Sequence, residues 1–571
     1  MAWYDEAVFY HIYPLGLTGA PKQNPYVAPE HRLNTLLAWI SHIRELGCNA
    51  IYIGPLFESV GHGYETTDYK KLDSRLGTNE DLTNFVKECH AQGIKVILDG
   101  VFNHTGRDFF AFQDIKKNRE NSPYKDWYCN VNFRGNNEYN DGFSYENWGG
   151  YNLLVKLNQS NPAVKDYICD VIRFWVSEFD IDGIRLDAAD VLNFEYMQAL
   201  RRVANEVKPD FWLMGEVIHG DYNRWVNEGT LHSVTNYHLH KALYSGHNDH
   251  NYFEIAHTVK RLYEMGGSRP EGLKLYNFVD NHDVERIYTK LSNKAHYTPV
   301  HILLYTLPGV PSIYYGSEFG INGKKEQFSD DSLRPALVLS DFANAVTENP
   351  CTRLLAALGR IRQTTTALSY GDYKELLLTN RQYAFARNHN GITVIVTVNN
   401  DDSDYVMTLP CGNSTEYKGA LSGETAAVTD GHITVNVKAN SGEIWVPVEV
   451  GATEPNDTDK TECTTTTECN TKQEAEPEDW FFESAFITTP LPPQETVIEA
   501  PTPQPEEASA MSADSASAFD NDAFERGKIA GLQEAILAIM ERKGPVTDQM
   551  RNDVYNNTHH DSLVNWVKSF Y

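Results

Sequence analysis

The segment that decides the fold is KVILDGVFNH, residues 95–104. An apolar run typical of a buried strand comes first, and the polar residues Asp99, Asn103 and His104 follow it. The same order recurs in DGIRLD (182–187), WLMGEV (212–217) and LYNFVDNHD (275–283). Apolar runs that repeatedly end in polar residues predict a parallel sheet with a functional site at its strand ends.

Eight such apolar runs lie within the first 370 residues, and helical patterns separate them. The predicted strands cover residues 7–14, 48–55, 95–101, 182–187, 212–217, 232–237, 275–281 and 311–316. The predicted helices include 32–46, 79–92, 162–179, 194–207, 252–265 and 298–307. Eight strand–helix cycles over this length indicate an α/β fold, a (β/α)₈ TIM barrel over residues 1–370, rather than an open sheet.

Four further segments complete the predicted organisation. A stretch rich in Asn, Tyr, Gly and Trp predicts a small domain inserted after the third strand, residues 105–158. Short strands separated by Asn, Asp and Gly turns predict a C-terminal antiparallel β-sandwich at 371–449. The Thr-, Glu- and Pro-rich residues 450–521 predict a disordered acidic linker, and helical periodicity predicts a small helical module at 522–571. That module either associates with a partner or another copy, or merely forms its own core.

Composition excludes several classes of function. The 78 acidic residues outnumber the 49 basic ones and give a formal net charge of −29, which disfavours nucleic acids and anionic membranes as partners. A neutral polymer meets no such repulsion. No apolar run reaches the ~20 residues of a membrane span, and the first residues carry no secretion-signal pattern. Eight cysteines without CxxC spacing predict free thiols, so we expect a cytoplasmic protein.

The polar residues at the strand ends indicate acid–base chemistry. Because strand side chains alternate, Arg185 and Asp187 should point into the barrel while Ile184 and Leu186 face the helices. A carboxylate beside a guanidinium should stay ionised, which suits a nucleophile. Glu216 ends an apolar strand, and partial desolvation should raise its pKa and favour proton donation.

Two carboxyl groups, one ionised and one protonated, suffice for glycoside hydrolysis through an oxocarbenium-like transition state. Asp283 supplies a third, which can stabilise the cation and hold sugar hydroxyls. Each residue alone has a simpler interpretation: an Asp at a strand end as a helix cap, Arg185 with Asp187 as a structural ion pair, His282 as a structural histidine. Their joint occurrence at successive strand ends favours a catalytic site.

These segments resemble the signature regions of the α-amylase family of glycoside hydrolases. DGVFNH, GIRLD, GE and FVDNHD match the family's four regions, GCNAIYIGP (47–55) and PGVPSIYYGSE (308–318) add support, and the resemblance covers residues 5–449. It implies that Asp187 is the nucleophile, Glu216 the acid/base and Asp283 the transition-state stabiliser. It also implies retention of anomeric configuration by double displacement, with the two reacting carboxyl groups about 5–5.5 Å apart.

The resemblance further implies a set of substrate-binding residues. They are Tyr64, His62, Asp99, His104, Arg185 and His282. Arg185 would orient Asp187, the two histidines of the strand ends would bind the sugar in the cleaved subsite, Tyr64 would stack on that sugar, and Asp99 would support the site.

Finer motifs indicate an oligosaccharide-acting member that cleaves α-1,4 bonds. VKLN (155–158) resembles neopullulanase and cyclomaltodextrinase relatives, and Ala188 after the nucleophile resembles α-1,4 rather than α-1,6 enzymes. The N-terminal β domain through which such relatives dimerise has no counterpart, so dimerisation is not expected. Asp190 and Val191 replace a common Lys-His pair, and Asn103 alone matches a family calcium ligand. We therefore expect no required metal or other cofactor.

Two other functions remain open. A transglycosylase would use the same three carboxylates and pass the glycosyl group to another sugar instead of water. A non-catalytic glucan-binding or scaffold barrel would need no acids at all. The sequence does not determine which of starch, maltodextrin, cyclodextrin and pullulan is the preferred substrate.

Overall fold

The computed structural model describes residues 2–448, except 268, 270 and 328, together with residues 536 and 554. The predicted linker at 450–521 lies outside the described residues, as does the helical module at 522–571 apart from those two positions. In the described part, no helix combines the length and apolarity needed to cross a membrane.

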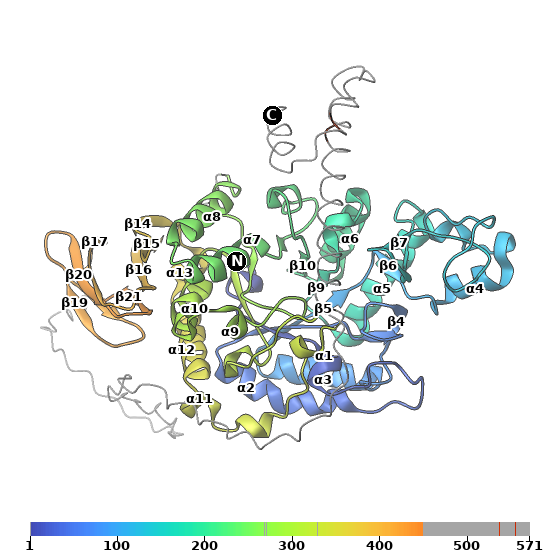
Figure 1. Cartoon of the computed structure of the whole chain (residues 1–571), viewed down its shortest axis with the longest axis horizontal. Helices are drawn as coiled ribbons and strands as arrows, with labels where there is room; N and C mark the ends of the chain where they lie inside the picture. The colour runs from blue at the N-terminus through green and yellow to red at the C-terminus, as the bar shows by residue number, and fades with distance from the viewer. Residues whose placement is uncertain are drawn as a thin grey trace, which may run out of the picture. The chain divides into compact units, whose positions relative to one another are not determined.

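Eight parallel strands form the predicted barrel, confirming the fold class (Figure 1). In chain order they are β1 (Phe9–Ile12), β2 (Ala50–Ile53), β5 (Lys95–Gly100), β9 (Gly183–Leu186), β10 (Trp212–Gly215), β11 (Ser233–Val234), β12 (Tyr276–Asn277) and β13 (Val310–Tyr314). Neighbours pair in the order β11-β10-β9-β5-β2-β1-β13-β12.

The barrel closes between its two shortest strands. A single parallel bridge joins Thr235, just after β11, to Tyr276 in β12. The next residue, Asn236, donates its backbone N–H to the Tyr276 carbonyl at 2.9 Å and its side-chain amide to Asn277 Oδ1 at 2.8 Å. We call this junction the seam. Side-chain amides thus supply part of the pairing that a longer ladder would provide.

Helices surround the barrel, most of them at predicted positions, whereas those at 237–248 and 350–364 lie outside the predicted ranges. The main ones are α2 (Trp39–Glu45), α3 (Asn79–Ala91), α5 (Pro162–Phe179), α6 (Phe194–Val207), α7 (Tyr237–Asn248), α8 (Tyr252–Glu264), α10 (Tyr297–Thr306) and α12 (Pro350–Thr364). The Asn161 side chain caps α5 by accepting from the Ala163 N–H, with Pro162 in the first turn. The predicted helix 32–46 differs: it runs as a 3₁₀ helix from Arg32 to Ala38 before α2 begins.

The barrel has an apolar floor and an apolar outer layer. Inside, Phe9 stacks on Trp212 with ring centroids 5.1 Å apart, and Met214 and Tyr276 fill the same cluster. Ile184 belongs instead to the large cluster between sheet and helices. Side chains at the carboxyl ends of the strands therefore rest on a closed hydrophobic base that excludes water from below.

The inserted segment has a helix and a small sheet of its own. It contains α4 (Phe110–Asn118) and a three-stranded sheet of β6 (His104–Thr105), β8 (Tyr151–Lys156) and β7 (Asn147–Trp148) in the order β6-β8-β7 (Figure 1). Because β6 directly follows β5 of the barrel, this sheet begins at the mouth of the barrel.

The C-terminal strands pair antiparallel, as predicted. One sheet has the order β14 (Lys374–Leu378), β15 (Gln382–His389), β16 (Ile392–Asn399), β21 (Ser441–Pro447), β18 (Glu416–Gly419), β19 (Thr425–Ala427), and β17 (Tyr405–Pro410) pairs with β20 (His432–Val437). Buried Arg387 in β15 donates to the Thr306 carbonyl at the end of α10, 2.6 Å away, and so joins this domain to the barrel.

Candidate active site

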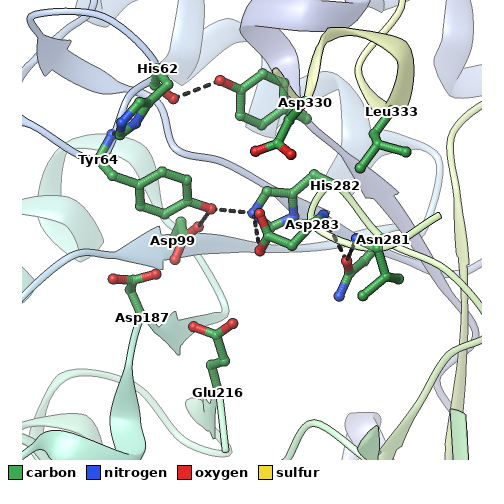
Figure 2. Close-up of polar contacts among 12 residues, drawn as sticks. His62, Tyr64, Asp99, Asp187, Glu216, Asn281, His282, Asp283, Asp330 and Leu333 are labelled. Carbon is green, nitrogen blue, oxygen red and sulfur yellow. Dashed lines mark hydrogen bonds and ion pairs between the residues drawn. The ribbon is translucent and has the colours of Figure 1, made fainter. Parts of the chain in front are cut away.

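Four acidic residues meet at the carboxyl ends of the strands. Asp99 lies within β5, Asp187 follows β9 and Glu216 follows β10, each directly, and Asp283 lies six residues beyond β12. Figure 2 shows Asp187 and Glu216 pointing into the same space, with Asp99 and Asp283 beside it. Asp99 is 2% exposed and Asp187 8% exposed, so this space is largely shielded from solvent.

Arg185 connects three of these acids. Its Nη1 lies 2.9 Å from Asp99 Oδ1 and 2.9 Å from Asp187 Oδ1, and its Nη2 lies 2.9 Å from Glu216 Oε2. The predicted proximity of Arg185 to Asp187 is present, and alternation along β9 explains it. The bonds to Asp99 and Glu216 depend on neighbouring strands, which the sequence does not place.

The sharing of Arg185 changes the expected electrostatics. Burial and the nearby Glu216 carboxylate raise the pKa of Asp187, against the opposing effect of Arg185. This direction does not support our expectation that the neighbouring Arg185 keeps Asp187 ionised, because the burial of Asp187 outweighs the effect of Arg185. Burial also raises the pKa of Glu216, in the direction predicted for a proton donor, while Arg185 opposes it.

A strained turn couples the strands that carry Asp187 and Glu216. Ala188 has φ 47° and ψ 43°, a left-handed conformation that non-glycine residues seldom adopt. This conformation lets the Ala188 N–H donate to Glu216 Oε2 at 3.0 Å. The residue after the candidate nucleophile thus helps to orient the candidate acid/base.

An aromatic ring and an imidazole form one wall of the site. Tyr64 Oη donates to Asp99 Oδ2 at 3.1 Å and contacts His282 Nε2, and the Tyr64 and His282 rings stack at 5.8 Å with 12° between their planes. Burial lowers the pKa of His282, and it lowers that of His104 to about 3, so both imidazoles are neutral at pH 7. Neutral imidazoles and hydroxyls are suited to binding sugar hydroxyls.

His62 lies beside this wall rather than in it. Its carbonyl accepts from Tyr13 Oη at 2.6 Å, and its Nε2 lies 3.2 Å from Glu65 Oε1. Figure 2 places the His62 imidazole next to Tyr64 and away from the carboxyl groups of Asp187 and Glu216. Of the residues predicted for the site, His62 is therefore the one directed elsewhere.

Arg334 is a site residue that sequence reasoning missed. Its Nη2 lies 2.9 Å from Asp283 Oδ1 and 3.1 Å from Asp330 Oδ2, and its Nε donates to the His282 carbonyl at 2.9 Å. It lies in an irregular loop after β13, where no periodicity marks it. Tyr52, which donates to Asp99 Oδ2 at 2.8 Å, was also missed, although alternation with apolar neighbours in β2 was a usable signal.

Asn103, the residue that matches a family calcium ligand, is bound by another protein side chain. Asn103 Oδ1 accepts from Gln159 Nε2 at 3.0 Å, and Gln159 Oε1 accepts from the Asn193 N–H at 2.6 Å. Among the described residues, no group of three or more His, Cys, Asp or Glu side chains is placed to hold a metal ion. That the protein requires no calcium stays a prediction. The six described cysteines are free thiols: Cys48, Cys89, Cys129, Cys169, Cys351 and Cys411.

A cleft of about 430 Å³ opens on the Glu216 side of the site. Its lining includes Ile218, His219, Tyr237, His238, His257 and Arg261. Tyr237 forms the boundary with the acids, since its Oη accepts from Asn281 Nδ2 at 3.2 Å and the charges of Glu216 and Asp283 contribute to raising its pKa, after burial. Tyr237 thus lies between the polar side chains of the cleft and the acidic residues.

Comparison with known proteins agrees with this arrangement. Residues 33–360 match the family "Alpha amylase, catalytic domain", and residues 371–445 match "Alpha-amylase C-terminal domain". A cyclomaltodextrinase of Bacillus sp is 30% identical over 448 residues, which cover 74% of this chain and 77% of the relative. Neopullulanase 2 of Thermoactinomyces vulgaris is 29% identical over 469 residues, 77% of this chain and 78% of the relative.

Solved structures give the same result. A debranching enzyme from Nostoc punctiforme superposes with a TM-score of 0.67 at 28% identity, covering 78% of this chain and 98% of that one. A cyclomaltodextrinase superposes with a TM-score of 0.68 at 27% identity, covering 78% of each chain. With the barrel, the order of its acidic segments and the family match spanning more than half of the chain, this protein belongs to the α-amylase family of glycoside hydrolases.

Proposed function

We propose that this chain cleaves α-1,4-glucosidic bonds in maltodextrins, starch fragments or cyclodextrins, with retention of anomeric configuration. The observation that carries the proposal is the shared guanidinium of Arg185, which binds both Asp187 and Glu216 at 2.9 Å in a buried pocket. Three carboxylates around one guanidinium leave excess negative charge, and a proton on one of them reduces that excess. The site is thus suited to keep one acid protonated and another ionised.

In the proposed reaction Glu216 donates its proton to the glycosidic oxygen while Asp187 attacks the anomeric carbon. The bond from that carbon to the leaving oxygen breaks, and a covalent bond to the Asp187 carboxylate forms. Glu216, now ionised, then removes a proton from water, and the resulting hydroxide displaces Asp187. Asp283 bears negative charge toward the positively charged transition state, and Tyr64, His104 and His282 hold the sugar ring.

The test is incubation with maltoheptaose, β-cyclodextrin, pullulan and isomaltose, followed by product chromatography and NMR of the first-formed anomer. We expect short maltooligosaccharides from the first two substrates, an α-anomer as first product, and no cleavage of isomaltose. Asp187→Asn should abolish turnover and still bind maltoheptaose. A β-anomer would exclude the retaining mechanism, and unchanged turnover in Asp187→Asn would exclude the assignment of the nucleophile.

A second reaction, transglycosylation, is favoured by the cleft beside Glu216. His219, His257 and Arg261 in its lining would bind the hydroxyl groups of an acceptor sugar, and the same carboxylates would serve. Incubation with concentrated maltotriose separates the two: longer oligomers as the main products would show that transfer exceeds hydrolysis.

The setting of the enzyme completes the proposal. A cytoplasmic location is supported by its free thiols and by a 29% identical relative, the intracellular maltogenic amylase of Bacillus subtilis, which matches over 57% of each chain.

We also propose that residues 522–571 mediate self-association or binding to a partner. Truncation at residue 450 should then lower the oligomeric mass or lose a bound partner; unchanged mass and activity would refute that role.

A further inference from the structure

Two aromatic side chains lie exposed at the tip of the β7–β8 hairpin in the inserted unit. Trp148 is 37% exposed and Tyr151 is 64% exposed, although large aromatic residues are usually covered. The two are register partners across a turn of Gly149 and Gly150, whose φ angles are 65° and 83°. Directly paired residues project to the same face of a hairpin, so Trp148 and Tyr151 are expected to share one face.

This hairpin is part of the same small sheet as a residue of the active site. β8 pairs with β6 through His104 and Lys156, and β6 begins at His104 itself. The Trp148 ring also contacts the His104 imidazole, with centroids 5.8 Å apart and 30° between the planes. A sugar bound against His104 therefore has the indole of Trp148 as its next neighbour on this side of the site.

The chemistry of this surface fits a sugar chain. The C–H face of a pyranose packs on an aromatic ring, and the hydroxyl edge stays in water or bonds to polar groups. The formal net charge of −29 disfavours nucleic acid as the occupant. Continuity with His104 favours an extension of the substrate rather than a separate molecule.

We propose that Trp148 and Tyr151 form an aromatic platform that binds a glucose unit beyond the one cleaved at Asp187. This inference rests on the proposed function and names a further binding site for it. The platform makes the enzyme sensitive to the length of its α-glucan substrate, because a short substrate ends before the hairpin and a long one reaches it.

The kinetic test compares maltotriose with maltoheptaose. Trp148→Ala and Tyr151→Ala should each lower kcat/KM for maltoheptaose by roughly three- to tenfold, the size of an aromatic packing contact, with a much smaller change for maltotriose. Trp148→Phe should retain most of the activity. Phe253→Ala, which removes a 48% exposed aromatic residue from α8, is the matched control and should change neither substrate.

Two outcomes would overturn the platform. Equal losses for both substrates in Trp148→Ala, with none in Tyr151→Ala, would mean that Trp148 only supports His104. No kinetic change in either variant, combined with a lower oligomeric mass, would assign the hairpin to contact between copies.

Calorimetry on Asp187→Asn separates this proposal from the proposed function. Removing Trp148 in that background should weaken maltoheptaose binding by the same factor, even if the wild-type enzyme proves to have another reaction. Unchanged affinity refutes the platform, whereas absence of glucan cleavage by the wild type refutes the proposed function alone.

Discussion

The guanidinium of Arg334 lies 2.9 Å from the carboxylate of Asp283, although 51 residues separate them in the chain. Arg334 also bonds to the carbonyl of His282, the residue before Asp283. Two contacts from one side chain hold both the backbone and the carboxylate of this segment. Asp283 itself is 35% exposed at its side chain, so it depends on this partner for a fixed position.

Replacing Arg334 with Met should therefore lower kcat by about 10- to 100-fold, because a small displacement of a catalytic group has an effect of that size. KM should change less than kcat. Arg334→Lys should fall between the two, since an ammonium keeps the charge but not the planar fork. Arg173→Met, which removes an exposed cation paired with Asp170 and Glu206, should have wild-type kinetics. An effect confined to KM would show that Arg334 binds substrate instead.

Glu216→Gln should increase stability while abolishing activity. Burial raises the folded pKa of Glu216 above its ordinary 4.5. Between those two values the folded protein keeps a proton that the unfolded chain releases, so stability falls as pH rises through that interval. Glutamine has no ionisable carboxyl group, so the Glu216→Gln variant does not lose this stability as pH rises. Thermal unfolding should give a higher Tm than wild type at pH 7 and convergence below pH 4.5; a variant that is less stable at both pH values contradicts the prediction.

Acid should destabilise the protein through buried neutral histidines such as His301. Burial lowers the pKa of His301 from 6.5 to about 4. Between pH 6.5 and pH 4 the unfolded chain therefore binds a proton at this residue that the folded protein does not bind. Stability is therefore lost as pH falls from 6.5 to 4, by up to roughly 3 kcal/mol for this residue. Urea unfolding of His301→Gln at pH 7 and pH 4.5 should show a smaller difference than wild type; an equal difference would assign the acid sensitivity to other groups.

Removal of divalent metal should leave activity within about twofold of the untreated enzyme, because the Asn103 oxygen is already bound by Gln159. Dialysis against EDTA and assay on maltoheptaose check this. A loss that calcium restores and magnesium does not would establish a calcium site.

Local alternation explains which parts of the site could be predicted. The inward direction of Arg185 and Asp187 follows from the period of β9, and Glu216 from the end of β10. Arg334 could not be found in this way, because a loop residue acquires its partner only through the three-dimensional fold. The same limit explains the pKa of Asp187: its sequence neighbour Arg185 was visible, but the burial that raises this pKa most, and the Glu216 carboxylate that adds to it, depend on the fold.

The bounds of long elements were predicted more accurately than those of short ones. α5 and α6 begin and end at the predicted residues, since long helices show a clear periodicity. The predicted strands at 232–237 and 275–281 shorten to two residues each in β11 and β12. Side-chain bonding between Asn236 and Asn277 replaces the ladder there, and hydrophobic pattern carries no information about such a bond.

The seam between β11 and β12 has a consequence for how substrate and protein affect each other. Glu216 follows β10 on one side of the seam and Asp283 follows β12 on the other, so a sugar that contacts both crosslinks the barrel where its own pairing is thinnest. Amide protons at residues 234–236 and 276–277 should exchange with deuterium faster than those of β5 and β9 in the free enzyme. Binding of maltoheptaose to Asp187→Asn should selectively slow the exchange of these amide protons, because the bound ligand stabilises the barrel wall reversibly.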